Sequence, residues 1–192
     1  MYEIFVLLLP RNTPAQVAEL VDAHDSNSCT SGVRVRFPPW AQNLLMTKQE
    51  RYDRTYLRMA REWASLSHCA RRQVGALIVR GRTIISDGFN GTPTGFENPC
   101  EEELGDTKWY VLHAEANAIL KVASSTQSCS GATLYLTMSP CRDCSKLIHQ
   151  SGIVRVVYAD NYKDTTGLDF LAKAGVQLDY LPFEDAQATD LG

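Results

Sequence analysis

Two short motifs contain residues whose types and spacing suit a metal-dependent catalytic site: His113 with Glu115, and Cys141 with Cys144. One imidazole and two thiolates form a soft donor set that favours zinc over calcium or magnesium. A catalytic zinc site takes three protein ligands and leaves the fourth position to water or substrate. His113, Cys141 and Cys144 supply those three ligands, so Glu115 is not needed by the metal and can handle a proton. The sequence therefore predicts one catalytic Zn²⁺ per chain.

The spacing of the two cysteines predicts that both contact the same metal ion. Cys141 and Cys144 are three residues apart. A helix that begins at Pro140 would place both on one face. The N–H groups at a helix N-terminus also favour the thiolate over the thiol.

Each motif alone has a less specific interpretation. A single C-x-x-C motif also occurs in redox pairs and in halves of structural zinc sites. A structural site would need a fourth ligand, yet the sequence has no second C-x-x-C motif and no H-x-x-x-H motif. A redox pair would leave His113 and Glu115 unexplained. The combination H-x-E followed by P-C-x-x-C is the signature of zinc-dependent nucleobase deaminases.

Composition narrows the class of protein. The chain has 192 residues, a net charge of -3 and 44% hydrophobic residues, which fits one α/β domain. This mild acidity argues against a stable nucleic-acid partner. No apolar run reaches transmembrane length, and residues 4–9 lack the basic flank of a signal peptide. The six cysteines form no secretory framework, so we expect a cytoplasmic protein with no membrane partner.

Residues 1–45 differ from the rest of the chain and are predicted to lie outside the domain. They contain four prolines and show no sustained helical or strand period. Residues 15–23 and 33–35 can be back-translated to resemble the D-arm and T-loop of a tRNA gene. Translation through an upstream tRNA gene, with Met46 as the true start, is one interpretation, and an ordinary N-terminal extension is the other. The predicted domain spans residues 46–184, and residues 185–192 form an acidic tail.

Hydrophobic periodicity between these limits predicts alternating helices and strands. Helices are expected from Thr47 and over 112–123, 141–150 and 167–174, and strands over 74–79, 82–88, 132–138, 153–158 and 176–180. This alternation predicts a three-layer α/β/α fold with a central mixed sheet of about five strands. The loop from Gly88 to Gly95 follows the second strand and is rich in turn-forming residues.

The domain resembles the deoxycytidylate (dCMP) deaminases of the cytidine deaminase-like fold from about Tyr52 to Tyr180. The resemblance rests on residues 71–76, 88–93, 113–119, 139–144 and 152–158, followed by Tyr162. It implies zinc-dependent conversion of dCMP to dUMP, with Glu115 moving a proton from the attacking water to N3 of cytosine. It also implies that the substrate contacts residues on several loops: Asn90, Gly91, Thr92, Ala114, Ser139 and Tyr162.

The family also implies further ligands and partners. Some members hold a second, structural zinc, and Cys69 and Cys100 match two of its ligands. No histidine lies between Cys100 and His113, so we expect two buried free thiols there and no second zinc. A homo-oligomer, as large as a hexamer, and regulation by dCTP and dTTP are also expected.

Other functions stay open at this point. The same motifs would serve deamination of cytidine, guanine, a riboflavin precursor or adenosine in tRNA. A tRNA enzyme would be expected to present a basic surface, which this sequence does not indicate. A non-enzymatic, competence-related zinc protein is a further possibility, but it would have no use for Glu115.

Overall fold

The computed structural model describes residues 46–183, so the predictions for residues 1–45 and for the tail, residues 185–192, lie outside the described residues. The described part begins with helix α3, Lys48–Ala64. Thr47 precedes it, and its hydroxyl accepts a hydrogen bond of 3.1 Å from the backbone N–H of Glu50, as in a helix cap. No helix among the described residues is both long and apolar enough to span a membrane.

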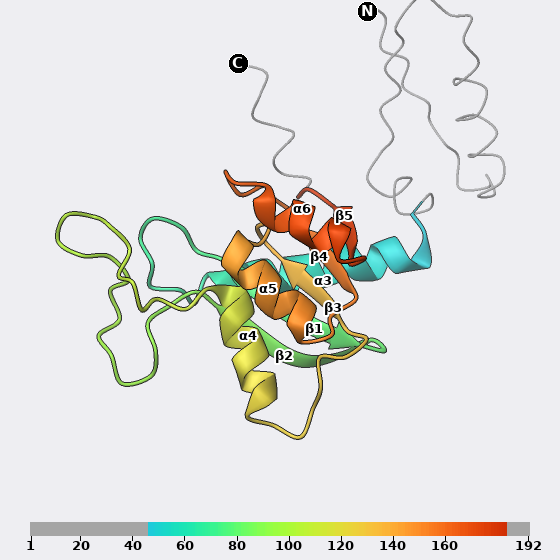
Figure 1. Cartoon of the computed structure of the whole chain (residues 1–192), viewed down its shortest axis with the longest axis horizontal. Helices are drawn as coiled ribbons and strands as arrows, with labels where there is room; N and C mark the ends of the chain where they lie inside the picture. Colours follow the sequence, from blue (N-terminus) through green and yellow to red (C-terminus); the bar gives the residue numbers. More distant parts are fainter. Residues whose placement is uncertain (1–45, 184–192) are drawn as a thin grey trace, which may run out of the picture. The chain divides into compact units, whose positions relative to one another are not determined.

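A five-stranded mixed sheet forms the centre of the fold (Figure 1). Its strand order is β2-β1-β3-β4-β5. The strands are β1 (Gly75–Arg80), β2 (Thr83–Phe89), β3 (Thr133–Leu136), β4 (Arg155–Tyr158) and β5 (Gln177–Tyr180). β1 pairs antiparallel with β2 and with β3, whereas β3, β4 and β5 are parallel.

Helices cover both faces of the sheet, which confirms the predicted three-layer architecture (Figure 1). α3 lies against one face. The opposite face is covered by α4 (Ala114–Ala123), α5 (Arg142–Gln150) and α6 (Thr166–Lys173). Each parallel pair of strands is joined through one helix, α5 or α6, as parallel strands require a crossover.

The central strand β3 shows why this sheet is buried on both faces. Leu134 and Leu136 belong to the main core cluster with Ala118 and Ile148 of the covering helices. Tyr135, between them, points the other way, and its ring packs at a tilt against that of Tyr56 in α3, with the ring centroids 5.0 Å apart. Because both faces of this strand are covered, Leu134, Tyr135 and Leu136 are all buried.

Two glycines allow helices to approach the sheet closely. A Cβ atom at Gly75 of β1 would overlap with the backbone oxygen of Ala60 in α3. A Cβ atom at Gly88 of β2 would overlap with the backbone oxygen of Ala114 in the first turn of α4. The start of α4, which carries Glu115, is therefore seated directly on β2.

A buried ionic network ties α3 to the parallel strands. Asp53 of α3 accepts hydrogen bonds of 3.0 and 2.8 Å from the guanidinium of Arg155 in β4. The hydroxyl of Tyr135 donates to the same carboxylate at 2.6 Å. Arg155 also donates to Asp179 of β5 at 2.6 Å. The network connects one helix with three neighbouring strands.

Cys69 and Cys100 form a disulfide, which corrects the expectation of two free thiols. The expectation that both are buried is confirmed. The carboxylate of Glu101 accepts hydrogen bonds from the backbone N–H groups of Ala70 and Arg71. These bonds hold the long loop after β2 against the segment before β1, and the two cysteine Cα atoms lie 4.9 Å apart. The absence of a second zinc at these sulfurs stays a prediction.

Candidate active site

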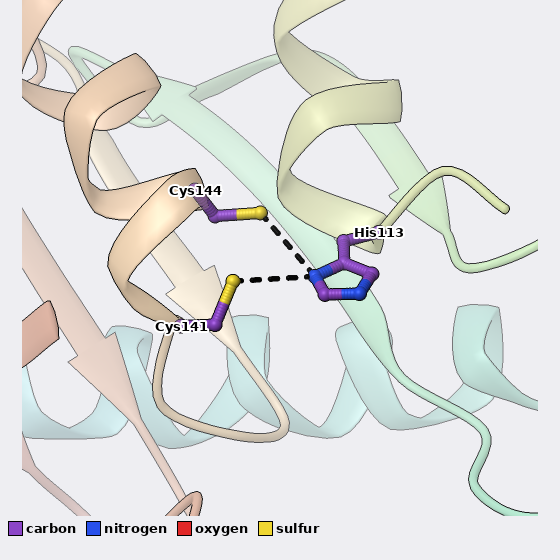
Figure 2. A group of neighbouring side chains, drawn as sticks. All are labelled: His113, Cys141 and Cys144. Atoms are coloured by element: carbon purple, nitrogen blue, oxygen red, sulfur yellow. Dashed lines mark hydrogen bonds between the residues drawn. The ribbon is translucent and has the colours of Figure 1, made fainter. Parts of the chain in front are cut away.

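The N-termini of two helices bring the three predicted metal ligands together. His113 is the N-cap residue of α4, and Cys141 is the N-cap residue of α5. Cys144 lies in the first turn of α5. In Figure 2 both cysteine side chains point from α5 toward the imidazole of His113. The packing of α4 beside α5 on one face of the sheet therefore brings the three predicted metal ligands together.

The spacing of these donor atoms fits a zinc ion. Nδ1 of His113 lies 3.5 Å from Sγ of Cys141 and 3.4 Å from Sγ of Cys144. With Zn–N near 2.0–2.1 Å and Zn–S near 2.3 Å, tetrahedral geometry separates nitrogen and sulfur by about 3.5 Å. All three ligand atoms lie within 4.8 Å of one another. The donor types and their separations both match a three-ligand zinc site.

The neighbouring groups at the site favour the thiolate form of Cys141. A hydrogen bond from Cys144, supported by His113, lowers the pKa of the Cys141 thiol to about 4. The same bond to Cys141, together with burial, raises the pKa of Cys144. The hydrogen bond to Cys141 also raises the pKa of His113. A dication is the charge that would stabilise both sulfurs as thiolates.

Glu115 is placed to hold a proton beside these ligands. It lies in the first turn of α4, two residues after His113, and is only 4% exposed. Burial raises the pKa of its carboxyl to about 7. A general acid–base group works best when its pKa lies near the operating pH. The carboxyl of Glu115 therefore lies close to the metal ligands and can exchange a proton near neutral pH, and its catalytic role stays a prediction.

A pocket of about 530 Å³ opens onto this cluster. His113, Glu115 and Cys141 line it, with Cys144 buried behind. Pockets that bind small molecules span roughly 300–1,000 Å³. The volume and the position of the pocket suit a ligand about the size of a mononucleotide.

Four of the predicted substrate-binding residues line this pocket: Asn90, Ala114, Ser139 and Tyr162. Gly91 and Thr92 are not among its lining residues. Gly91 instead exchanges backbone hydrogen bonds with Leu112, and so fixes the segment that leads into His113. For all six, contact with substrate stays a prediction.

Asn90 and Ser139 are engaged in holding neighbouring backbone. The side-chain oxygen of Asn90 accepts a bond of 2.7 Å from the N–H of Val74, and its amide nitrogen donates to the Arg72 carbonyl at 2.8 Å. The hydroxyl of Ser139 accepts a bond of 2.7 Å from the N–H of Tyr162. Both residues therefore shape the pocket walls.

Three basic residues that line the pocket had no substrate role in the sequence prediction: Arg71, Arg72 and Lys163. The sequence gives only weak signals for a role of these three residues in the pocket. Arg71 and Arg72 precede the first strand, and Lys163 follows Tyr162, but nothing in their spacing indicates that these segments face one another. The sheet topology brings them to the same pocket.

Replacing Cys144 with alanine should abolish stoichiometric zinc binding, because two protein ligands remain where three are needed. Elemental analysis of the purified protein should find about one zinc per wild-type chain and far less in the variant. Cys129→Ala is the matched control, since Cys129 is also buried but lies outside the cluster. Unchanged zinc content in Cys144→Ala would contradict the ligand assignment.

The chain is similar in sequence to known proteins. Residues 50–160 match the family model of the cytidine and deoxycytidylate deaminase zinc-binding region. The deoxycytidylate deaminase of Enterobacteria phage T4 is 34% identical over 171 residues, covering 67% of this chain and 89% of the phage protein. That of Schizosaccharomyces pombe is 39% identical over 150 residues, covering 70% of this chain and 46% of the yeast protein.

A solved structure extends the similarity to the fold. The dCMP deaminase of cyanophage S-TIM5, crystallised with dCMP and dUMP, is 42% identical to this chain. The match has a TM-score of 0.67 and covers 71% of this chain and 99% of the cyanophage chain. With the family model covering the metal ligands, Glu115 and most of the sheet, the chain belongs to the cytidine and deoxycytidylate deaminase family of zinc-binding proteins.

Proposed function

We propose that this protein is a zinc-dependent hydrolase that converts dCMP and water to dUMP and ammonia. The observation that carries the proposal is the buried carboxyl of Glu115 beside three zinc ligands, at a pocket of mononucleotide size. The deoxycytidylate deaminase of phage T4 and the dCMP deaminase of cyanophage S-TIM5 match this chain over 89% and 99% of their own lengths, and the latter was crystallised with dCMP and dUMP. Supply of dUMP would feed thymidylate synthesis.

His113, Cys141 and Cys144 would hold the zinc ion, which would supply a Lewis acid able to lower the pKa of a water molecule to about 7. The oxygen of water forms a bond to C4 of cytosine while the carboxylate of Glu115 accepts a proton. Glu115 then delivers that proton to N3. A second proton transfer through Glu115 reaches the 4-amino nitrogen, the C4–N4 bond breaks, and ammonia leaves uracil behind.

The proposed substrate contacts follow the pocket walls. We assign the sugar to Asn90 with Gly91 and Thr92 of the same loop, and the base to Tyr162; of these four residues, Asn90 and Tyr162 line the pocket. Ala114 and Ser139 flank the metal ligands His113 and Cys141 in the chain. The backbone of Ala114 and the hydroxyl of Ser139 offer polar atoms to the pyrimidine.

The proposal is tested by following ammonia release and product identity with dCMP, CMP, deoxycytidine and adenosine-containing RNA. We expect dCMP to give the highest kcat/KM, with dUMP as product. Deamination confined to adenosine-containing RNA would contradict the proposal, as would an inactive protein with full zinc content.

The alternatives are less well supported. Enzymes acting on cytidine, guanine, a riboflavin precursor or tRNA adenosine use related motifs, but the relatives described above are dCMP deaminases. A non-enzymatic zinc protein of competence systems has no need of a buried carboxyl with a pKa near 7.

The same proposal extends to assembly and location. We expect a homo-oligomer, as large as a hexamer, activated by dCTP and inhibited by dTTP, acting in the cytoplasm on a small-molecule substrate. Gel filtration and kinetics with each nucleotide address the first two points. A monomeric elution volume, or hyperbolic kinetics indifferent to both nucleotides, would count against them.

A further inference from the structure

The metal ligands belong to the starts of two different helices, and a glycine of a third element lies behind each start. His113 precedes α4 and Cys141 precedes α5 (Figure 2). Gly88 of β2 contacts the first turn of α4, and Gly167 of α6 contacts the turn that carries Cys141. The separation of the donor atoms therefore depends on how closely β2 and α6 approach these two helix starts.

Gly167 contacts the backbone on the thiolate side of the cluster. It is buried near the start of α6. A Cβ atom at this position would lie 2.5 Å from the carbonyl oxygen of Pro140 and 2.9 Å from the carbonyl carbon of Cys141. Both distances are much shorter than an ordinary van der Waals contact. Because the atoms that it would meet are backbone atoms, a side chain at Gly167 would displace the turn that carries Cys141.

The hydroxyl of Ser145 contacts both α6 and this turn. Ser145 is fully buried in α5, one residue after Cys144. Its hydroxyl donates a hydrogen bond of 2.9 Å to the carbonyl of Cys141, and it would lie 2.6 Å from a Cβ atom at Gly167. A serine that bonds to the carbonyl one turn earlier is common in helices. Here that carbonyl belongs to a metal ligand, and the hydroxyl is covered by a second helix.

Contacts that do not involve the metal ligands fix the start of α6. The carboxylate of Asp164 accepts bonds of 3.0 and 2.8 Å from the N–H and the hydroxyl of Thr166, the residue before Gly167. The N–H of Ser139, just before the turn, donates to the carbonyl of Asp160 at 2.8 Å. The segment from β4 to α6 therefore provides a fixed support for the turn.

Gly88 has the equivalent position on the imidazole side. A Cβ atom there would overlap with the carbonyl oxygen of Ala114 and lie 2.7 Å from the backbone nitrogen of Ala118. Ser86, on the same face of β2, donates a hydrogen bond of 2.8 Å to the carbonyl of Ala118. These contacts fix the height of α4 above the sheet, and with it the position of His113.

We infer that Gly88, Gly167 and Ser145 are positioning residues of the zinc site, which set the distance between the two helix starts and so between the three donor atoms. Residues that orient metal ligands typically change metal affinity by about 10- to 100-fold when they are replaced. The inference rests on the zinc assignment and not on the identity of the base that is deaminated.

The test measures the zinc dissociation constant of the full-length protein by competition with a chromophoric chelator. Gly167→Ala and Ser145→Ala should each weaken zinc binding by about 10- to 100-fold. Ser151→Ala is the matched control, because the Ser151 hydroxyl also donates to a carbonyl of α5, that of Ile148, but at the opposite end of the helix. We expect this control to keep the wild-type affinity.

Cobalt substitution gives a second readout that general destabilisation does not change. The visible absorption of Co²⁺ depends on the arrangement of its thiolate and imidazole donors, so the bands should shift in Ser145→Ala, Gly167→Ala and Gly88→Ala and stay unchanged in Ser151→Ala. If a glycine variant does not fold, Ser145→Ala decides.

Wild-type zinc affinity or wild-type bands in Ser145→Ala would overturn the inference, as would an equal loss of affinity in Ser151→Ala. A wild-type chain that binds no zinc would overturn it together with the zinc assignment. Turnover of dCMP does not enter the test, so failure of the proposed substrate is recognised separately.

Discussion

Replacing Glu115 with glutamine is expected to lower kcat for dCMP by about 10³-fold or more while zinc content stays near one per chain. General acid–base groups contribute about 10²–10⁴-fold, and Glu115 is proposed to act in more than one proton transfer. Glutamine keeps the volume of the buried side chain but cannot hold the proton. Discontinuous assays of dUMP formation measure kcat, and elemental analysis of the same sample measures the zinc content.

A control variant, Glu103→Gln, distinguishes the loss of proton transfer from the loss of one negative charge. Glu103 is exposed in the long loop after β2 and does not line the pocket. Glu103→Gln removes one carboxylate from the chain, and we expect its kcat to match the wild type within about twofold. If Glu115→Gln kept more than about a tenth of the wild-type kcat, the proton-carrier role would have to be abandoned.

Replacing Arg155 with methionine should lower the free energy of unfolding by about 3–5 kcal/mol, because it leaves the Asp53 carboxylate buried without the guanidinium that neutralises it. The two side chains are 16% and 6% exposed, so water cannot readily take over. Chemical denaturation followed by circular dichroism measures the change.

Two further variants test whether the loss of unfolding free energy arises from the buried charge of Asp53. The double variant Asp53→Asn/Arg155→Met removes both charges and should recover part of the stability, as is found when both partners of a buried pair are replaced. Lys146→Met removes an exposed pair with Asp143, whose side chains are 64% and 72% exposed, and should cost at most about 1 kcal/mol. A loss in Arg155→Met no larger than that in Lys146→Met would contradict the prediction.

Local patterns were sufficient to predict the order of the elements. The apolar run at 74–79 predicted the strand observed as β1, and the helical period over 112–123 predicted the helix observed as α4. The observed boundaries differ from the predicted ones by one or two residues. Helix and strand periodicity are properties of neighbouring residues, so the sequence alone carries them. The three zinc ligands were also predictable, because donor chemistry and the C-x-x-C spacing restrict the metal strongly.

Long-range partners could not be predicted in the same way. Arg155 and Asp53 are 102 residues apart, and Arg155 occupies a strand in which either face could have been solvated. The pairing of Cys69 with Cys100 depends on where the long loop after β2 folds back, which has no periodic signal. Lys163 and Arg72 line the same pocket because β4 lies two strands from β1 in the sheet, and local patterns do not reveal this strand order.

His113 and Cys141 occupy positions where a metal ligand takes the place of a residue that would stabilise the helix. Both occupy N-cap positions with extended backbone, ψ 156° and 167°, and neither makes a side-chain capping hydrogen bond. Asparagine, aspartate or serine at such a position typically stabilises a helix by about 0.5–2 kcal/mol relative to residues that do not cap. In the presence of a chelator, His113→Asn should therefore resist denaturant better than the wild type. Selection of a library for thermal stability alone, with zinc withheld, would enrich capping residues at both positions and would discard the active site.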